Sequence, residues 1–286
     1  MIDMTKNPTI ELLKTIVSSP IGAVGLIMVI WFILTALIVA VGGGSVLPYN
    51  PLKQNVGPAL AGPSLQHPFG TDRLGRDQLS RVLYATPNAL LVCTIVIGSA
   101  LLIGTVIGSL SAYHGGPLDE VLMRITDIFL ALPSIILPIS ISVVLGPGLT
   151  NMMYALMATW WPSYTRMARG ETLRVVQYDF IEAAKAAGLN SSKIILKHVI
   201  PNIIVTMVVF ATIDFGQVIM VYAGLSYLGL SVQPPMPDWG AMVNEYQNYI
   251  VAAPWLPLFP SVVVGIVVIG FALLGDRLRD VFEFHE

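Results

Sequence analysis

The chain has 286 residues, of which 55% are hydrophobic and only 11% are charged. Soluble domains carry about 25% charged residues, so this composition excludes an ordinary soluble domain and indicates a membrane protein. The net charge of −2 offers no basic field for nucleic acid. Cys93 is the one cysteine of the sequence. It cannot form an intrachain disulfide, and a metal site would need further ligands beside it.

Six apolar segments follow one another along the chain. Backbone polar groups in hydrocarbon need internal partners, so each segment is expected to cross the bilayer as a helix. The segments lie at about 21–41, 89–112, 125–145, 149–164, 202–222 and 255–274. The first is longer than the core of a signal peptide and is expected to remain as a signal anchor. The sequence therefore predicts an all-α polytopic membrane protein with six transmembrane helices.

Prolines and glycines give some of these segments special features. Pro133 and Pro138 interrupt the third segment, where they either kink the helix or are accommodated by its surroundings. The fourth segment is short and contains Pro162. Gly104 and Gly108 in the second segment form a G-x-x-x-G pattern, which predicts a close approach by another helix.

The distribution of Lys and Arg predicts the orientation. With the N-terminus placed inside, 11 of the 15 Lys and Arg residues fall in inside segments. The other four, Lys53, Arg73, Arg76 and Arg81, lie in the long loop after the first span. Because Lys and Arg are enriched on the cytosolic side, we expect both termini to be cytosolic.

A polar segment from residue 178 to residue 201, here called the elbow, separates the fourth and fifth spans. Its small residues allow another surface to approach closely, and Gly188 is suited to end a helix in a left-handed conformation. Asn190, Ser191 or Ser192 can then cap a second helix. The residues alone fit two interpretations: a helix-turn-helix that contacts a cytosolic partner, or an amphipathic linker on the membrane surface.

The elbow resembles the EAA loop of ABC-transporter permeases. The matching residues are Glu182, Ala183, Ala184, Gly188 and Pro201, whereas His198 and Ile200 replace the usual Ile and Leu. The resemblance implies that the region of about 170–201 docks in a groove of a cytosolic ATPase subunit. It would transmit nucleotide-driven closure to the membrane helices.

Further stretches resemble dipeptide/oligopeptide/nickel permeases, and in particular the second of that family's two paired permease types. They are His67-Pro68-Phe69-Gly70-Thr71-Asp72-Arg73-Leu74-Gly75-Arg76-Asp77, Leu145-Gly146-Pro147-Gly148, Leu225-Ser226-Tyr227-Leu228-Gly229-Leu230, Gln233-Pro234-Pro235 with Asp238-Trp239-Gly240, and Leu274-Gly275-Asp276-Arg277-Leu278-Arg279-Asp280. The resemblance implies a type I ABC-importer permease fold. We expect residues 1–65 to form an N-terminal segment with the first span, and residues 66–286 to form the transmembrane domain.

The resemblance also implies partners and a location. They are a second homologous permease, two cytosolic subunits that bind ATP and Mg, and an extracytoplasmic binding protein, in the cytoplasmic (inner) membrane of a bacterium or archaeon. The sequence has no G-x-x-x-x-G-K-[ST], so the chain itself is expected to bind no ATP. It also has no H-E-x-x-H or C-x-x-C motif, and its histidines are scattered over different loops, so no metal and no other cofactor are expected. The expected function is transport rather than catalysis. The cargo implied by the family is a dipeptide or oligopeptide, glutathione, a metal chelate such as that of nickel, or a sugar.

Asp214 lies near the middle of the fifth segment. An ionisable group there costs about 2.5–3.5 kcal/mol on insertion scales, so it is expected to face the bundle or a wet cavity. It either lines the substrate path with Gln217 and Tyr222, or pairs with a neighbouring helix.

Charged and aromatic residues also gather in the two long outer loops. They are either paired among themselves or in contact with the binding protein or the partner permease, since Arg and Trp are enriched in such contacts. These residues are Asp72, Arg73, Arg76, Asp77, Asp238 and Trp239.

The sequence leaves an alternative function, a stand-alone ion-coupled secondary transporter. Inverted repeats or clustered midplane charges would favour it, and the sequence shows neither. An intramembrane hydrolase is a third hypothesis, and no nucleophile–base pair supports it.

Overall fold

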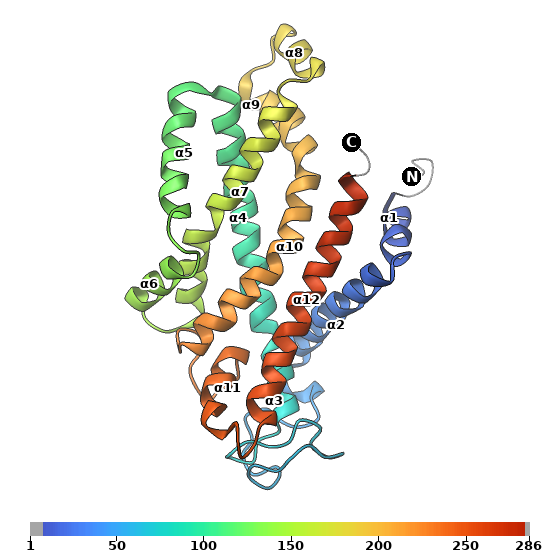
Figure 1. Ribbon diagram of the computed structural model, residues 1–286, viewed down its shortest axis with the longest axis vertical. Helices are drawn as coiled ribbons and strands as arrows, with labels where there is room; N and C mark the ends of the chain where they lie inside the picture. Colours follow the sequence, from blue (N-terminus) through green and yellow to red (C-terminus); the bar gives the residue numbers. More distant parts are fainter. Residues whose placement is uncertain (1–7, 284–286) are drawn as a thin grey trace. The chain divides into compact units, whose positions relative to one another are not determined.

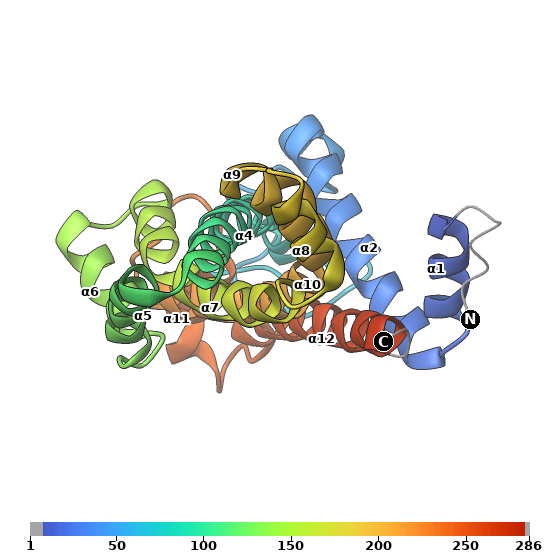
Figure 2. The ribbon, with the colours of Figure 1, turned by 90° about the horizontal axis from the view of Figure 1, so that it is seen from above.

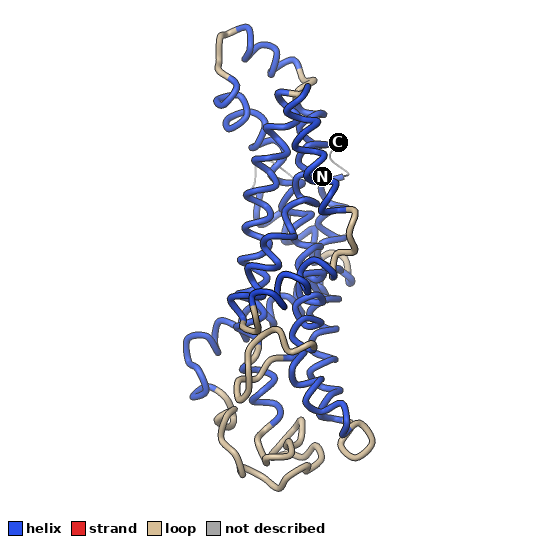
Figure 3. The backbone as a smooth tube through the Cα atoms, turned by 90° about the vertical axis from the view of Figure 1, so that its left-hand side faces the viewer, coloured by secondary structure: helices blue, strands red, loops and turns tan. Residues whose placement is uncertain are grey.

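The computed structural model describes residues 8–283, which form helices and connecting loops without a β-strand (Figures 1 and 3). An isolated β-bridge joins Thr71 to Asp77. The helices are α1 (Pro8–Val17), α2 (Pro20–Gly42), η1 (Gly43–Val46), α3 (Gln78–Tyr84), α4 (Thr86–His114), α5 (Gly116–Leu130), α6 (Ile136–Leu145), α7 (Leu149–Val175), α8 (Asp179–Ala186), α9 (Ser191–Ile194), η2 (Ile195–Val199), α10 (Ile200–Tyr227), α11 (Trp239–Tyr246), η3 (Gln247–Tyr249) and α12 (Trp255–Glu283).

The chain divides into two compact units. Unit 1 contains the chain up to residue 94, residues 142–152 and the chain from residue 213 onward. Unit 2 contains residues 95–141 and 153–212. The boundaries fall inside α4, α6, α7 and α10, so each of these helices contributes to both units.

In unit 1, α2 packs against α12, and the start of α2 lies beside the C-terminal part of α12 (Figures 1 and 2). Small residues allow this: a Cβ atom on Gly25 would lie 2.8 Å from the backbone nitrogen of Leu274. Phe32 of α2 is fully buried, with its ring centroid 6.1 Å from those of Phe271 and Trp239. Apolar burial and ring packing therefore hold α2, α11 and α12 together.

In unit 2, α4 approaches α7 closely at two glycines. A Cβ atom on Gly104 would lie 2.8 Å from the backbone nitrogen of Thr165, and one on Gly108 would lie 2.8 Å from that of Arg169. The Ser109 and Thr172 side-chain oxygens lie 3.2 Å apart in the same interface. The close approach predicted from Gly104 and Gly108 is confirmed.

Four helices in the described part of the chain are long and apolar enough to cross a membrane. They are Pro20–Val46, Gln78–His114, Ser191–Tyr227 and Trp255–Phe282, and they correspond to the first, second, fifth and sixth expected spans. Four of the six expected spans are thus confirmed. The fourth expected span lies within α7, which continues beyond residue 164 to Val175.

The third expected span, 125–145, is interrupted as Pro133 predicts, but as a break rather than a kink: α5 ends at Leu130 and α6 begins at Ile136. Pro133 lies in the intervening residues, where a proline disfavours helical geometry in the residue before it. Pro138 sits in the first turn of α6, where its missing N–H group removes no internal hydrogen bond.

Two prolines lie deep inside helices, and each leaves the carbonyl four residues earlier without its usual N–H donor. Pro162 of α7 frees the Ala158 carbonyl, which accepts from Trp161 Nε1 at 3.1 Å. Pro260 of α12 frees the buried Leu256 carbonyl, which accepts from Gln78 Nε2 at 2.9 Å. Side-chain donors therefore replace the lost backbone bonds, which allows proline inside membrane helices.

Candidate functional site

The first candidate site is the elbow, which folds as α8, a tight turn and α9 (Figure 1). Gly188 has φ of +77°, the left-handed conformation expected for it. Its N–H group donates to the Lys185 carbonyl at 3.0 Å, and the Leu189 N–H group donates to the Ala184 carbonyl at 3.2 Å. This pair of bonds is a Schellman motif and fixes the direction in which the chain leaves α8.

The second half of the elbow begins at Asn190, one of the three residues expected to cap it. The Asn190 side chain accepts from the Lys193 N–H group at 2.9 Å. The helix then passes through a π turn, η2, in which the Ile200 N–H group donates to the carbonyl of Ile195 five residues earlier. Pro201 has no N–H group to bond to the Lys197 carbonyl. The π turn therefore lies next to a position where one α-helical hydrogen bond is missing in any case.

His198, which departs from the family pattern, lies within this π turn. Its carbonyl accepts a hydrogen bond from Asn202 Nδ2 at 2.6 Å. Its side chain is half-buried, whereas the neighbouring Val199 is completely buried. The helix thus points the apolar neighbour inward and leaves the imidazole at the edge of the buried face.

The elbow divides its residues between a buried and an exposed face. Ile181 and Ala184 are buried, as are Ile194 and Val199 of the second half. Lys185 places its ammonium group 5.5 Å from the ring centroid of Tyr113, at the end of α4. The remaining residues of the expected coupling set are exposed, namely Glu182, Ala183, Gly188 and Pro201.

Two ion pairs join α5 to α7 in the same unit. Arg169 binds Asp119 through two parallel bonds, Nε to Oδ1 at 2.7 Å and Nη2 to Oδ2 at 2.6 Å. Hydrogen bonds from Arg169 and from Ser111 lower the pKa of Asp119 below its ordinary value, against the opposing effect of burial. Arg166 likewise pairs with Asp127. Nothing in the sequence indicates these pairs, because the partners lie 39 and 50 residues away along the chain.

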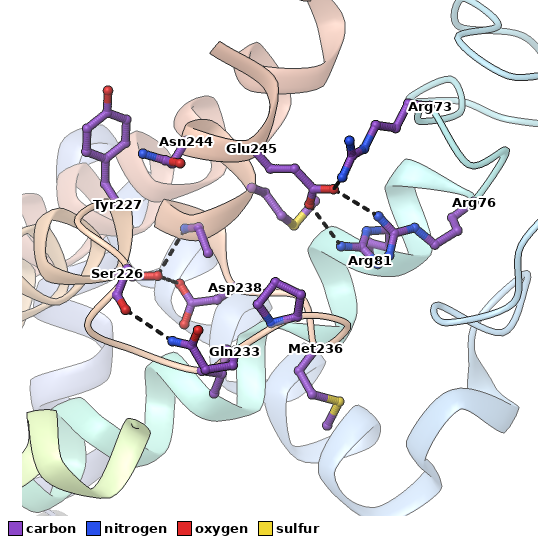
Figure 4. Close-up of a pocket in the computed structure, with 15 residues that line it drawn as sticks. Arg73, Arg76, Arg81, Ser226, Tyr227, Gln233, Met236, Asp238, Asn244 and Glu245 are labelled. Atoms are coloured by element: carbon purple, nitrogen blue, oxygen red, sulfur yellow. Dashed lines mark hydrogen bonds and ion pairs between the residues drawn. The ribbon is translucent and has the colours of Figure 1, made fainter. Parts of the chain in front are cut away.

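The second candidate site is in unit 1 and is here called the charge cluster: Asp72, Arg73, Arg76, Arg81 and Glu245. Figure 4 shows the three arginines and Glu245. Asp72 is completely buried. Its carboxylate accepts from Arg76 Nε at 2.5 Å, from the backbone N–H groups of Leu74 and Arg76 at 2.8 and 2.9 Å, and from the Tyr246 hydroxyl at 2.9 Å. Burial by itself lowers the pKa of Arg76, but the interactions with Tyr246, Asp72 and Glu245 outweigh it and raise the pKa.

Asp77 lies beside the charge cluster and begins α3. Its carboxylate accepts from the Ser80 N–H group at 2.8 Å and from the Ser80 hydroxyl at 2.7 Å, so it is the N-cap of that helix. The other oxygen lies 2.8 Å from Nδ1 of the buried His67. The contact between His67 and Asp77 therefore joins the two ends of the stretch 67–77.

Asp238 is the centre of a buried group of hydroxyls. It accepts from Tyr222, Ser226 and Ser231 and from the Gly240 N–H group, and it caps α11. Burial raises the pKa of Asp238 above its ordinary value, although the three hydroxyl donors act in the opposite direction. The Asp238 carboxylate thus joins the end of α10 to the start of α11.

Trp239 and Gly240 complete this junction. Trp239 is buried and donates from Nε1 to the Val82 carbonyl at 2.9 Å. A Cβ atom on Gly240 would lie 2.6 Å from the backbone nitrogen of Tyr227. The Asp238-Trp239-Gly240 stretch therefore provides a cap, a buried ring and a close helix approach.

The residues expected to line the substrate path and those expected in the outer loops do not form two separate groups in the structure. Tyr222 bonds to Asp238 of the outer-loop set rather than sharing a site with Asp214. Asp214 itself is 8% exposed in α10, and Gln217 is exposed. Arg73 has 53% of its side chain exposed, whereas Asp72, Arg76, Asp77, Asp238 and Trp239 are buried within the chain.

Sequence reasoning missed Glu245, Tyr246 and the role of Arg81. Arg81 does stand directly before three largely apolar residues, Val82, Leu83 and Tyr84, and a charged group beside apolar residues needs a partner if it is buried. The other two occur about 170 residues after Arg76. Among residues 8–283, no three His, Cys, Asp or Glu side chains form a group that could hold a metal ion.

In residues 8–283, long apolar helices with a short two-helix elbow between two of them define a polytopic membrane protein. The chain belongs to the family described as "Binding-protein-dependent transport system inner membrane component", which matches residues 104–285, more than half of the sequence.

Curated relatives agree with this assignment. The dipeptide transport system permease protein DppC of Alkalihalophilus pseudofirmus is 38% identical over 97% of this chain and 90% of its own length. The glutathione transport system permease protein GsiD of Pectobacterium atrosepticum is 40% identical over 78% of this chain and 74% of its own length. The probable D,D-dipeptide permease DdpC of Escherichia coli is 39% identical over 78% and 75%.

Among solved structures, an inward-facing form of the MetNI methionine ABC transporter shares the fold. The TM-score is 0.59 at 22% identity, with 71% of this chain and 97% of that chain covered. The resemblance found in the sequence is therefore confirmed at the level of family and fold. The chain is a multi-pass permease subunit of an ABC importer, whose ATP is hydrolysed by separate ATPase subunits. This assignment supports the importer over a stand-alone ion-coupled transporter.

Proposed function

We propose that this chain imports peptides of about dipeptide size as one of two paired permeases. Two ATPase subunits that bind ATP and Mg and an extracytoplasmic binding protein would complete the complex in a cytoplasmic membrane, with both chain termini in the cytosol. The names of the relatives support a peptide cargo, since they are dipeptide, D,D-dipeptide and glutathione permeases. Glutathione is itself a small peptide, so one substrate class covers all three.

The elbow is the observation that carries this proposal. Glu182 and Ala183 lie on its exposed face, while Ile181 and Ala184 are buried on the opposite side. We propose that the exposed face, with Gly188 and Pro201 fixing its shape, fits a groove on an ATPase subunit. The exposed Glu182 carboxylate in the first turn of α8 is suited to polar donors in such a groove.

The outer loops have a separate proposed role. Asp72, Arg76, Asp77, Asp238 and Trp239 hold these loops in one shape from within. The exposed surface that they support, including Arg73, is proposed to contact the binding protein or the partner permease. In this arrangement the buried charges position the contact surface and the exposed ones form it.

The substrate path is proposed to follow α10. Gln217 and Asp214 are three residues apart and therefore neighbours on the surface of that helix. Gln217, which is exposed, is the member able to meet a peptide bond directly. Tyr222 contributes by holding Asp238 and thereby the end of the helix.

Reconstitution in proteoliposomes tests the proposal. The chain, its paired permease, the ATPase subunits and the binding protein are expected to import a radiolabelled dipeptide only when ATP is enclosed with the ATPase subunits. Glutathione and an unrelated sugar serve as the second and third substrates. Uptake by this chain alone, driven by an ion gradient, would contradict the proposed mechanism; uptake of the sugar but of neither peptide would contradict the proposed cargo.

A further inference from the structure

Unit 1 contains a cavity of about 280 Å³ beside the charge cluster (Figure 4). It is bounded by the residues before α3 and by α3 itself, by the end of α10, by the loop that follows α10, and by α11. The guanidinium groups of Arg73, Arg76 and Arg81 form one end. The cavity is thus a depression with three guanidinium groups at one end.

One carboxylate, Glu245, faces all three arginines in this cavity (Figure 4). Its oxygens lie 3.5 Å from Arg73 Nη2, 3.2 Å from Arg76 Nη2 and 3.8 Å from Arg81 Nη2. Only the Arg76 contact is a hydrogen bond. Asp72 is the second carboxylate of the cluster, so three guanidinium groups face two carboxylates there. A third carboxylate that lines the cavity, Asp238, accepts hydrogen bonds from Tyr222, Ser226 and Ser231 instead of from these arginines.

Arg81 is the deepest of the three arginines, with 2% of its side chain exposed. Among the described residues its Nε atom has no hydrogen-bond partner, and the nearest Asp72 oxygen is 3.9 Å away. A buried charged donor without an acceptor is unfavourable. On the side that faces the cavity, Arg73 and Arg81 approach Glu245 only to 3.5 and 3.8 Å, without a hydrogen bond, so the arginine end can still donate to a further carboxylate oxygen.

The walls of the cavity are suited to a small organic molecule. Val232, Pro234, Met236 and Met242 provide apolar surface, and Gln233 and Asn244 add amide groups. Mostly apolar walls with a few polar groups at one end are typical of small-molecule sites, which measure about 300–1,000 Å³. The cavity volume of about 280 Å³ lies just below that range. It is larger than one inserted acidic side chain would fill, and it suits a ligand of dipeptide size.

We propose that this cavity binds a small carboxylate ligand, with its carboxylate at Arg73, Arg76 and Arg81 in competition with Glu245. Given the proposed function, the ligand is a peptide and the anchored group is its C-terminal carboxylate. Glu245 occupies the arginines when the cavity is empty and is displaced when the ligand enters. The side chain of the last residue of the peptide packs against Met236 and Met242.

The experiment measures ligand binding by calorimetry on the assembled permease complex without the binding protein. The probes are alanyl-alanine, alanyl-alanine amide and N-acetylalanine, which keeps a carboxylate but has no free amine. The wild-type complex should bind alanyl-alanine at least tenfold more tightly than the amide, and N-acetylalanine should also bind. Arg73→Gln should weaken alanyl-alanine binding about tenfold, because a charge-assisted bond is lost.

Glu245→Gln gives the more specific result. If Glu245 competes for the arginines, its neutralisation should strengthen alanyl-alanine binding several-fold, the opposite of the Arg73→Gln effect. A merely structural role for Glu245 would weaken binding instead. Arg124→Gln is the matched control, because Arg124 is an exposed arginine with a single exposed partner, Glu120, in unit 2. It should leave all three affinities unchanged.

Three results would overturn the cavity proposal. They are equal affinity for alanyl-alanine and its amide, weaker binding in Glu245→Gln, or a loss of affinity for the binding protein in Arg73→Gln with peptide binding intact. The last result would make an acidic residue of the binding protein the true occupant. Failure of the proposed function would give a different pattern of results from failure of the cavity proposal. The carboxylate probes would still bind in this cavity, but the complex would show no ATP-dependent uptake of peptides.

Discussion

Glu182 of the elbow is exposed, whereas Asp72 of the charge cluster is completely buried and accepts four hydrogen bonds. The elbow takes its shape from the backbone, through the left-handed Gly188 and the Asn190 cap. The charge cluster takes its shape from side chains that neutralise one another. Charged residues in a family motif can therefore serve as contact surface in one region and as internal support in another.

This difference predicts opposite consequences of mutation. Removing a buried charge from the cluster should damage the fold, because its former partners stay buried without compensation. Removing an exposed charge from the elbow should leave the fold intact and affect only what binds there. The following changes are ordered by their expected effect on folding, from the largest to the smallest.

Asp72→Ala should have the largest effect. It leaves Arg76 and Arg81 buried beside a single remaining carboxylate, and loss of one partner of a buried ion pair costs about 3–5 kcal/mol. We expect a large fall in the midpoint of thermal unfolding of the purified permease complex, and a smaller monodisperse fraction. Glu120→Ala is the control, since that exposed pair with Arg124 contributes about 0–1 kcal/mol. Equal effects of the two substitutions would show that the charges of the cluster do not support the fold.

Gly188→Val should have the next largest effect. A side chain at φ of +77° costs roughly 1–2 kcal/mol, and more when it is β-branched. The cost falls on the turn between α8 and α9, so we expect weaker co-purification of the ATPase subunits and lower ATP-dependent uptake. Gly188→Asn is the control, because asparagine tolerates the left-handed conformation. If both variants lose uptake equally, the backbone conformation is not the property that matters.

The sequence allows a backbone-determined site to be predicted more completely than a site made of paired side chains. Gly188 and Asn190 act within a few residues of themselves, so the turn and cap follow from local rules. Asp72 meets Tyr246 across 174 positions, and no local pattern indicates that contact. The third span could be predicted in part. Pro133 indicates that the helix is disturbed there, but whether the helix kinks or ends depends on the surrounding packing.

The ion pair between Asp119 and Arg169 should make a smaller, pH-dependent contribution. Arg169 lowers the pKa of Asp119 in the folded protein, so the pair stabilises the fold above the ordinary aspartate pKa of about 3.9. That contribution is lost as the pH falls through the lowered pKa. We expect Asp119→Asn to reduce stability by about 1 kcal/mol at pH 7. The difference from the wild type should shrink below about pH 4 in thermal unfolding; a difference that grows on acidification would contradict the assignment.

Glu182→Gln should have the smallest effect on folding and a large effect on transport. Glu182 is exposed in the first turn of α8, and surface substitutions of this kind change stability by at most about 0.5 kcal/mol. Asp179→Asn is the matched control, because Asp179 is also exposed in that turn and interacts with the same helix dipole. If the Glu182 carboxylate contacts the ATPase groove, Glu182→Gln should lower ATP-dependent uptake far more than Asp179→Asn, with unchanged unfolding midpoints in both. Equal losses of uptake would assign the effect to the charge at the start of α8, and the elbow would then act through its general electrostatics rather than through a specific contact.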